Sequence, residues 1–308
     1  MWSERVGLRI GLVALLSLLT SVGGAESARP TQVVQRSAST SVAHTESVAD
    51  EPPAPEPAGP PDPADPEPAD ASATSPVAAA PRTWHLVGLG DSVLTQCRCD
   101  GVLATYAGAV RDRTGDAIDA HNAADPGWSS ADVLWDLQHN GPTRDVVSSA
   151  DTVVVFAGAN DFTRAFDAVA AGAGTSAFRP VANQLEANLS AVVTEIRRLA
   201  PPGVRVVLCD YWNDFKAGAV AQREYSAARR TAAEEATIAT DNAIRSVAEQ
   251  TGAVYVSTRA AFASHPDVTG LLDPDGDHLS AAGARLVAGA ILAADPSVGS
   301  ESAAQADN

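Results

Sequence analysis

The chain has 308 residues, a length that allows one or two domains. It carries 38 acidic residues against 21 Lys and Arg, so its formal net charge at pH 7 is −17. Binding nucleic acid through its phosphates requires clustered Lys and Arg, so this charge balance argues against a nucleic-acid-binding protein. The charge fits a soluble protein that works outside the cell, but it does not identify a substrate.

The first 25 residues have the pattern of a signal peptide. Arg5 and Arg9 lead into an apolar run from Ile10 to Leu19, and Gly23-Gly24-Ala25 supplies small residues for cleavage. The apolar run is short for a transmembrane helix. We therefore expect a secreted or extracellular protein, held at the cell surface if the segment is not cleaved.

Residues 26–82 are predicted to be a disordered linker. The stretch from Glu51 to Asp70 is mostly Pro, Ala, Asp and Glu, and it has almost no apolar side chains with which to form a core. Proline and like charges keep such a chain extended. We interpret it as a spacer that lifts the folded domain off a surface or through a cell-wall layer. Residues 297–308 are expected to be a disordered tail.

From Thr83 onward the pattern alternates between strands and helices. The expected strands are Trp84–Leu89, Ala117–Asn122, Thr152–Ala157, Val204–Cys209 and Ala253–Ser257. The expected helices are Val102–Arg113, Ser130–His139, Val181–Leu199, Arg223–Gln250 and Ala281–Ala293. This order predicts an α/β domain over residues 83–296, a three-layer α/β/α sandwich with a five-stranded parallel sheet, similar to flavodoxin-like folds. Phe162–Pro180 and Tyr211–Val220 fit no element, and we expect them to overhang the carboxyl edge of the sheet.

Candidate reactive residues stand at the end of the first strand and near the end of the domain. Ser92 follows the apolar run Leu86–Leu89 in the turn Gly90-Asp91-Ser92, at the sheet edge where α/β proteins bind ligands. A serine hydroxyl needs a base to become a nucleophile. His278 offers one, and Asp275 precedes it by three residues on the same turn. The other histidines are interpreted as structural or surface residues: His44, His85, His121, His139 and His265.

A third motif, Gly158-Ala159-Asn160-Asp161, follows another apolar run. Together the three motifs resemble those of the SGNH (GDSL-type) hydrolases, and the resemblance covers residues 83–296. It implies a serine esterase with Ser92 as nucleophile and His278 as general base, oriented by Asp275. It also implies an oxyanion hole formed by the backbone N–H groups of Ser92 and Gly127 and by the Asn160 side chain. Asp161 would brace its turn.

Other interpretations accompany these residues. Ser92 in an isolated Gly-Asp-Ser also fits a helix N-cap. Asn160 also fits a simple turn residue. The family usually shows an Asn-x-Gly type of spacing before Gly127, whereas this chain has a longer gap that contains a Pro. Alternating Asp273, Asp275 and Asp277 resemble a calcium loop, but the Gly at the sixth position and the Glu at the twelfth are missing.

The chain has three cysteines, an odd number that leaves at least one thiol outside an intramolecular disulfide. Cys97 and Cys99 follow the nucleophile turn, and Cys209 ends the fourth strand. A bridge from Cys97 or Cys99 to Cys209 and a tight Cys97–Cys99 ring both fit this placement. Cys209 also fits a small buried apolar residue. None of these positions resembles a zinc site.

The resulting prediction is a secreted, monomeric esterase that cleaves carboxylic esters and needs no metal or organic cofactor. Its substrate is a small-molecule, lipid or glycan ester. One alternative is a polysaccharide or cell-wall O-acetyl esterase with the same chemistry, and another is a non-catalytic surface-binding protein on the same fold. Trp128, Trp212 and Phe215 fit either a substrate pocket or the core.

Overall fold

The computed structural model describes residues 82–97, 99–213 and 218–295, which belong to one unit starting at Ala79. The predicted signal peptide, the linker up to residue 81, Phe215 and the tail lie outside the described residues. Within the described part, no helix is long and apolar enough to cross a membrane.

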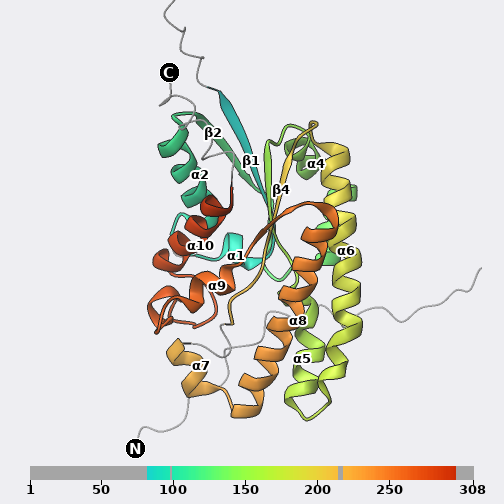
Figure 1. Cartoon of the computed structure of the whole chain (residues 1–308), viewed down its shortest axis with the longest axis vertical. Coiled ribbons are helices and arrows are strands. Elements are labelled where there is room, and N and C mark those ends of the chain that lie inside the picture. Colours follow the sequence, from blue (N-terminus) through green and yellow to red (C-terminus); the bar gives the residue numbers. More distant parts are fainter. Residues whose placement is uncertain (1–81, 98, 214–217, 296–308) are drawn as a thin grey trace, which may run out of the picture. The chain divides into compact units, whose positions relative to one another are not determined.

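Five parallel strands form the sheet, in the order β2-β1-β3-β4-β5 (Figure 1). Their bounds are Thr83–Gly90 for β1, Ala117–Asn122 for β2, Thr152–Phe156 for β3, Arg205–Cys209 for β4 and Val254–Val256 for β5. Every residue of β3 is buried, as expected of a parallel strand covered on both faces by helices. The predicted five-stranded parallel sheet is confirmed.

Helices cover both faces of the sheet and make the predicted three layers. The longer ones are α2 (Gly101–Thr114), α3 (Ser130–His139), α6 (Phe178–Leu199), α8 (Ala227–Thr251) and α10 (Ala281–Ala294). The shorter ones are α1 (Ser92–Thr95), α4 (Gly141–Val147), α5 (Thr163–Ala170), α7 (Gly218–Glu224) and α9 (Thr258–Ala263). Helices α2 and α10 pack together on one side, and α6 and α8 pack together on the other (Figure 1).

The predicted helix Arg223–Gln250 is wrong, because the chain forms two helices there. Helix α7 ends at Glu224 and α8 begins after Ser226, whose side chain accepts a hydrogen bond from the Arg229 amide. A serine N-cap of this kind starts a new helix even inside a stretch of strong helix formers.

The expected loop Phe162–Pro180 is also wrong in part. It contains α5, which buries Phe166, and the first turn of α6, which includes Pro180. Proline is tolerated in a first turn because the backbone N–H groups there have no helical partner.

The strand order places the functional edge of the sheet. The chain passes from β1 to β2 on one side and then returns to β3 on the other side of β1. Ligands of open α/β sheets bind at such a switch point, beyond the carboxyl ends of the strands. Ser92 follows β1 directly and therefore lies at this edge.

Gly90 allows the two central strands to meet closely at that edge. Its φ is +141°, and an added Cβ would lie 1.9 Å from the Phe156 carbonyl oxygen. The next amide, that of Asp91, donates to the same oxygen at 3.0 Å. A side chain at position 90 would push apart the strand ends that support Ser92.

We predict that Gly90→Ala destabilises the domain far more than Gly115→Ala. Both positions have positive φ, but an added Cβ at Gly115 meets nothing within 4 Å. Gly115→Ala should therefore cost about 1 kcal/mol of unfolding free energy, from backbone strain alone. Urea unfolding measures the unfolding free energy of both variants. Equal losses of stability would contradict the predicted clash with the Phe156 carbonyl.

Candidate active site

Ser92 is the first residue of the short helix α1, and Asp91 is its N-cap. The Asp91 Oδ1 atom accepts a hydrogen bond from the Val93 amide at 3.0 Å. The N-cap interpretation of Ser92 is therefore wrong, because its neighbour holds that position. The Ser92 hydroxyl makes no hydrogen bond within the described part of the chain, so it is available for another partner.

Asp275 and His278 form a hydrogen-bonded pair on one turn. The His278 Nδ1 atom lies 2.9 Å from Asp275 Oδ2, and Oδ1 accepts from the amides of Asp277 and His278 at 3.0 and 3.1 Å. Partial burial raises the pKa of Asp275, but these hydrogen bonds outweigh it and the pKa is lowered overall. An ionised Asp275 holds the imidazole with its proton on Nδ1, which leaves Nε2 as the basic nitrogen.

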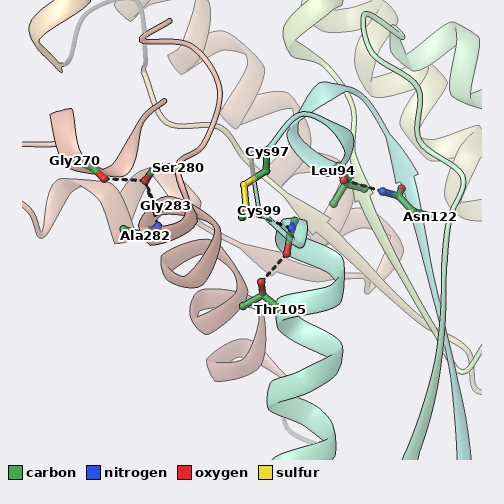
Figure 2. Close-up of a disulfide and its surroundings, with 10 residues drawn as sticks. Leu94, Cys97, Cys99, Thr105, Asn122, Gly270, Ser280, Ala282 and Gly283 are labelled. Atoms are coloured by element: carbon green, nitrogen blue, oxygen red, sulfur yellow. Dashed lines mark hydrogen bonds between the residues drawn. A yellow bond between two sulfur atoms is a disulfide. The ribbon is translucent and has the colours of Figure 1, made fainter. Parts of the chain in front are cut away.

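Backbone contacts bring this turn to the segment that follows Ser92. Cys97 forms a parallel bridge with Leu279, the residue directly after His278. Ser280 then donates to the Gly270 carbonyl at 2.8 Å and caps α10 through the amides of Ala282 and Gly283 (Figure 2). The segment after Ser92 and the turn of His278, which are far apart in sequence, are thereby joined.

The cysteines adopt one of the two arrangements left open by the sequence. Cys97 and Cys99 form a disulfide between the end of α1 and the start of α2 (Figure 2). Cys209 is a buried free thiol, and burial raises its pKa well above the ordinary value. The disulfide thus holds the segment that pairs with Leu279, whereas Cys209 packs as a small apolar residue.

Asn160 and Gly127 lie on turns that contact each other. The Asn160 side-chain amide donates to the Trp128 carbonyl at 2.9 Å. The loop that precedes Trp128 is bonded to β1, because the Asp125 amide donates to the Gly90 carbonyl at 3.0 Å. Gly127 is exposed with φ +83°, and a Cβ added there would meet no atom within 4 Å. These bonds gather both turns at the edge that carries Ser92.

Asp161 braces this edge from within. Its carboxylate accepts hydrogen bonds from the Ser130 amide at 2.9 Å and the Ser130 hydroxyl at 2.5 Å. Asn188 of α6 donates to the same hydroxyl at 2.9 Å. Burial raises the pKa of Asp161, and the bonds from Ser130 offset part of that rise. The network links the Asn160 turn, α3 and α6.

Tyr211 is a site residue that sequence reasoning missed. Its hydroxyl donates to Asp91 Oδ2 at 2.6 Å. Burial raises the pKa of Asp91 to about 6, the bonds from Tyr211 and Val93 oppose the rise, and the charges of Asp161 and Asp277 add to it. The available signal was position, because Tyr211 begins the segment expected to overhang the Ser92 edge.

Two hollows open on the described part of the chain, and neither is lined by Ser92, Asn160 or His278. One has a volume of about 380 Å³ and is lined by Asn122, Asp125, Trp128 and Asn140, among others. The other, of about 620 Å³, is lined by Trp212 and Phe262, whose rings stack with centroids 4.8 Å apart. Trp128 thus faces a hollow, and Trp212 belongs both to the core and to a hollow wall.

The described residues offer no metal centre. Within residues 82–97, 99–213 and 218–295, no group of three or more His, Cys, Asp or Glu side chains is placed to hold a metal ion. The Asp275 carboxylate, which a calcium loop would require as a ligand, is occupied by His278 and two backbone amides.

Comparison with known proteins decides the family. The model of the GDSL-like lipase/acylhydrolase family matches residues 89–286, a span that contains the Ser92, Asn160 and His278 motifs. The chain belongs to this family. It is accordingly a carboxylic ester hydrolase of the GDSL type. No curated protein matches the chain.

Solved structures share its fold at low sequence identity. The lipase Lip_vut3 from a goat rumen metagenome has a TM-score of 0.58 and 16% identity, over 69% of this chain and 97% of its own. A putative GDSL-like lipase from Parabacteroides merdae has a TM-score of 0.51 and 15% identity, over 70% and 96%. A catalytic mutant of Axe2, an acetylxylan esterase from Geobacillus stearothermophilus, has a TM-score of 0.50 and 20% identity, over 71% and 94%.

We predict that Asp91→Asn flattens the pH dependence of stability. The folded-state pKa of about 6 exceeds the ordinary 3.8, so the folded state retains a proton that the unfolded state releases between those values. The stabilising contribution of protonated Asp91 is therefore lost as pH rises through that window, by about 3 kcal/mol at about 1.4 kcal/mol per pKa unit. The measurement is unfolding free energy from about pH 4 to 7, in which the wild type should lose stability relative to Asp91→Asn.

The exposed Asp112 provides the control, since Asp112→Asn should leave the wild-type profile unchanged. A constant stability difference between the wild type and Asp91→Asn across this range would contradict the raised pKa.

Proposed function

We propose that this protein is a serine esterase that hydrolyses carboxylic esters through an acyl-enzyme on Ser92. The observation that carries the proposal is the Asp275–His278 pair at 2.9 Å, on a turn whose next residue bridges the segment after Ser92. Family membership supports the reaction class. His278 serves as general base and Asp275 as the group that orients it.

The chemistry runs in two halves. The Ser92 Oγ attacks the ester carbonyl carbon while His278 Nε2 takes its proton, and the tetrahedral intermediate expels an alkoxide that receives this proton. Water then attacks the acyl-enzyme with His278 again as base, and the carboxylic acid leaves as Ser92 regains its proton. The ionised Asp275 stabilises the imidazolium in both halves.

Three N–H donors would stabilise the oxyanion. The Ser92 amide heads α1 and makes no hydrogen bond within the residues described, and Asn160 uses one amide hydrogen on Trp128 and keeps a second. The Gly127 amide is the third proposed donor. Donors already fixed in place stabilise the developing charge without reorganisation during the reaction.

The second candidate function is a polysaccharide or cell-wall O-acetyl esterase. It is favoured by the hollow of about 380 Å³, whose lining residues include Asn122, Asp125, Asn140 and Trp128. A few polar groups around an aromatic ring can orient a hydroxyl-rich substrate, whereas a long acyl chain needs a more apolar wall.

The proposed site of action is outside the cell. Residues 1–25 carry the signal-peptide pattern, and the Pro-rich linker would space the domain from a surface or a cell-wall layer. The expected monomer is also part of this proposal.

Hydrolysis of p-nitrophenyl acetate, butyrate and palmitate tests the proposal. In the full chain, Ser92→Ala and His278→Ala should abolish hydrolysis, and Asp275→Asn should lower kcat about 10²–10⁴-fold because it disturbs the tautomer of His278. The exposed Ser149 and His139 provide matched controls, and Ser149→Ala and His139→Ala should keep full activity.

Full activity of Ser92→Ala would refute the acyl-enzyme. Hydrolysis of acetylated xylo-oligosaccharides in preference to all three p-nitrophenyl esters would select the O-acetyl esterase. If the wild type hydrolyses no ester but binds glycans, and Ser92→Ala still binds them, the protein is the non-catalytic binding protein.

A further inference from the structure

We propose that Tyr211 is a positioning residue for the nucleophile Ser92 and acts through the buried carboxylate of Asp91. The inference rests on the proposed function, because it concerns the residue that would attack the ester. It adds to the site a side chain from the segment after β4, which supplies none of the residues named in the proposed reaction.

Tyr211 is held from three directions. Its backbone amide donates to Asp241 Oδ1 of α8 at 3.1 Å. Its ring packs edge-on against Phe156, with centroids 6.0 Å apart and an angle of 77° between the planes. Its hydroxyl donates to Asp91 Oδ2 at 2.6 Å. With only 6% of the residue exposed, the phenol has no room to swing away from Asp91.

Asp91 passes this constraint to Ser92. Its amide donates to the Phe156 carbonyl, Oδ1 caps α1 through the Val93 amide, and Oδ2 receives the Tyr211 hydroxyl. Rotation of the carboxylate would therefore break the cap and the bond to Tyr211 together. Because Ser92 is the first residue of the helix that this cap starts, the carboxylate sets the direction of the nucleophile.

Tyr211 also favours the ionised form of Asp91. The Asp91 carboxylate is 1% exposed, and the negative charges of Asp161 and Asp277 face it from the two neighbouring turns. Its donors in the described part of the chain are the Tyr211 hydroxyl and the Val93 amide. Loss of the hydroxyl would raise the pKa of Asp91 above its present value of about 6. A neutral carboxyl accepts a weaker hydrogen bond than a carboxylate does. As the pH falls, Asp91 of the variant would therefore be protonated, and its cap of α1 would weaken, at a higher pH than in the wild type.

Tyr211→Phe separates this role from packing, because it keeps the ring against Phe156 and removes only the hydroxyl. The matched control is Tyr106→Phe. Tyr106 is 2% exposed and donates to Asp295 Oδ2 at 2.7 Å, but Asp295 also pairs with Arg205 at the start of β4, away from the Ser92 edge. Both variants delete one buried Tyr–Asp hydrogen bond.

The experiment measures kcat and KM for p-nitrophenyl acetate across the pH range, using the full chain. Tyr211→Phe should lower kcat about tenfold, the effect of losing one hydrogen bond to a charged group, and change KM less than about twofold. The fall of kcat on the acidic side of the pH profile (the acid limb) should lie at higher pH in Tyr211→Phe than in the wild type. Tyr106→Phe should lose similar stability and keep the wild-type kcat and acid limb.

A second background tests the route through Asp91. In Asp91→Asn, which has no carboxyl to titrate, adding Tyr211→Phe should not shift the acid limb. An unchanged kcat and acid limb in folded Tyr211→Phe, or equal effects of Tyr211→Phe and Tyr106→Phe, would overturn the inference. An equal shift in the Asp91→Asn background would do the same.

Labelling of Ser92 by a fluorophosphonate keeps this inference distinct from the proposed function. If the wild type labels but hydrolyses no ester, ester hydrolysis fails as the function, and slower labelling of Tyr211→Phe still supports the positioning role. Equal labelling rates would then overturn the role. A wild type that neither hydrolyses nor labels overturns both.

Discussion

The close approach of β1 and β3 at Gly90 is the constraint on which the rest of the site depends. With no side chain at this position, the Phe156 carbonyl can accept from the Asp91 amide while the Phe156 ring packs against Tyr211. The turn that follows β1 is thereby fixed to the most deeply buried strand of the sheet. Such support would orient the proposed nucleophile Ser92 before substrate arrives, as preorganised catalysis requires.

Around this junction, hydrogen bonds on carboxylates assemble segments from across the chain. Asp161 holds Ser130, Asp91 holds Tyr211, and Asp275 holds His278. The first two carboxylates are buried with raised pKa values, whereas the pKa of Asp275 is lowered by its donors. The edge of the sheet thus combines carboxylates that brace the structure with one that serves the proposed chemistry.

Sequence patterns predicted those parts of the protein whose signals are local. Buried strands such as β3 are continuous apolar runs, and the Gly-Asp-Ser turn directly follows one. Helix boundaries were less accurate where caps compete with propensity, as at Ser226 between α7 and α8. Helix α5 was missed because the segment around it is rich in Gly and Ala, and only the packing of Phe166 shows which face is buried.

The sequence by itself determined the fold class, the family resemblance and the candidate residues Ser92, Asn160 and His278, because short-range motifs and hydrophobic periodicity encode them. Only the tertiary structure decided that Tyr211 contacts Asp91, that Cys97 pairs with Cys99, and that Leu279 bridges Cys97. The physical reason is that such contacts depend on strand order and on how closely strand ends approach, and distance along the chain does not reveal either one.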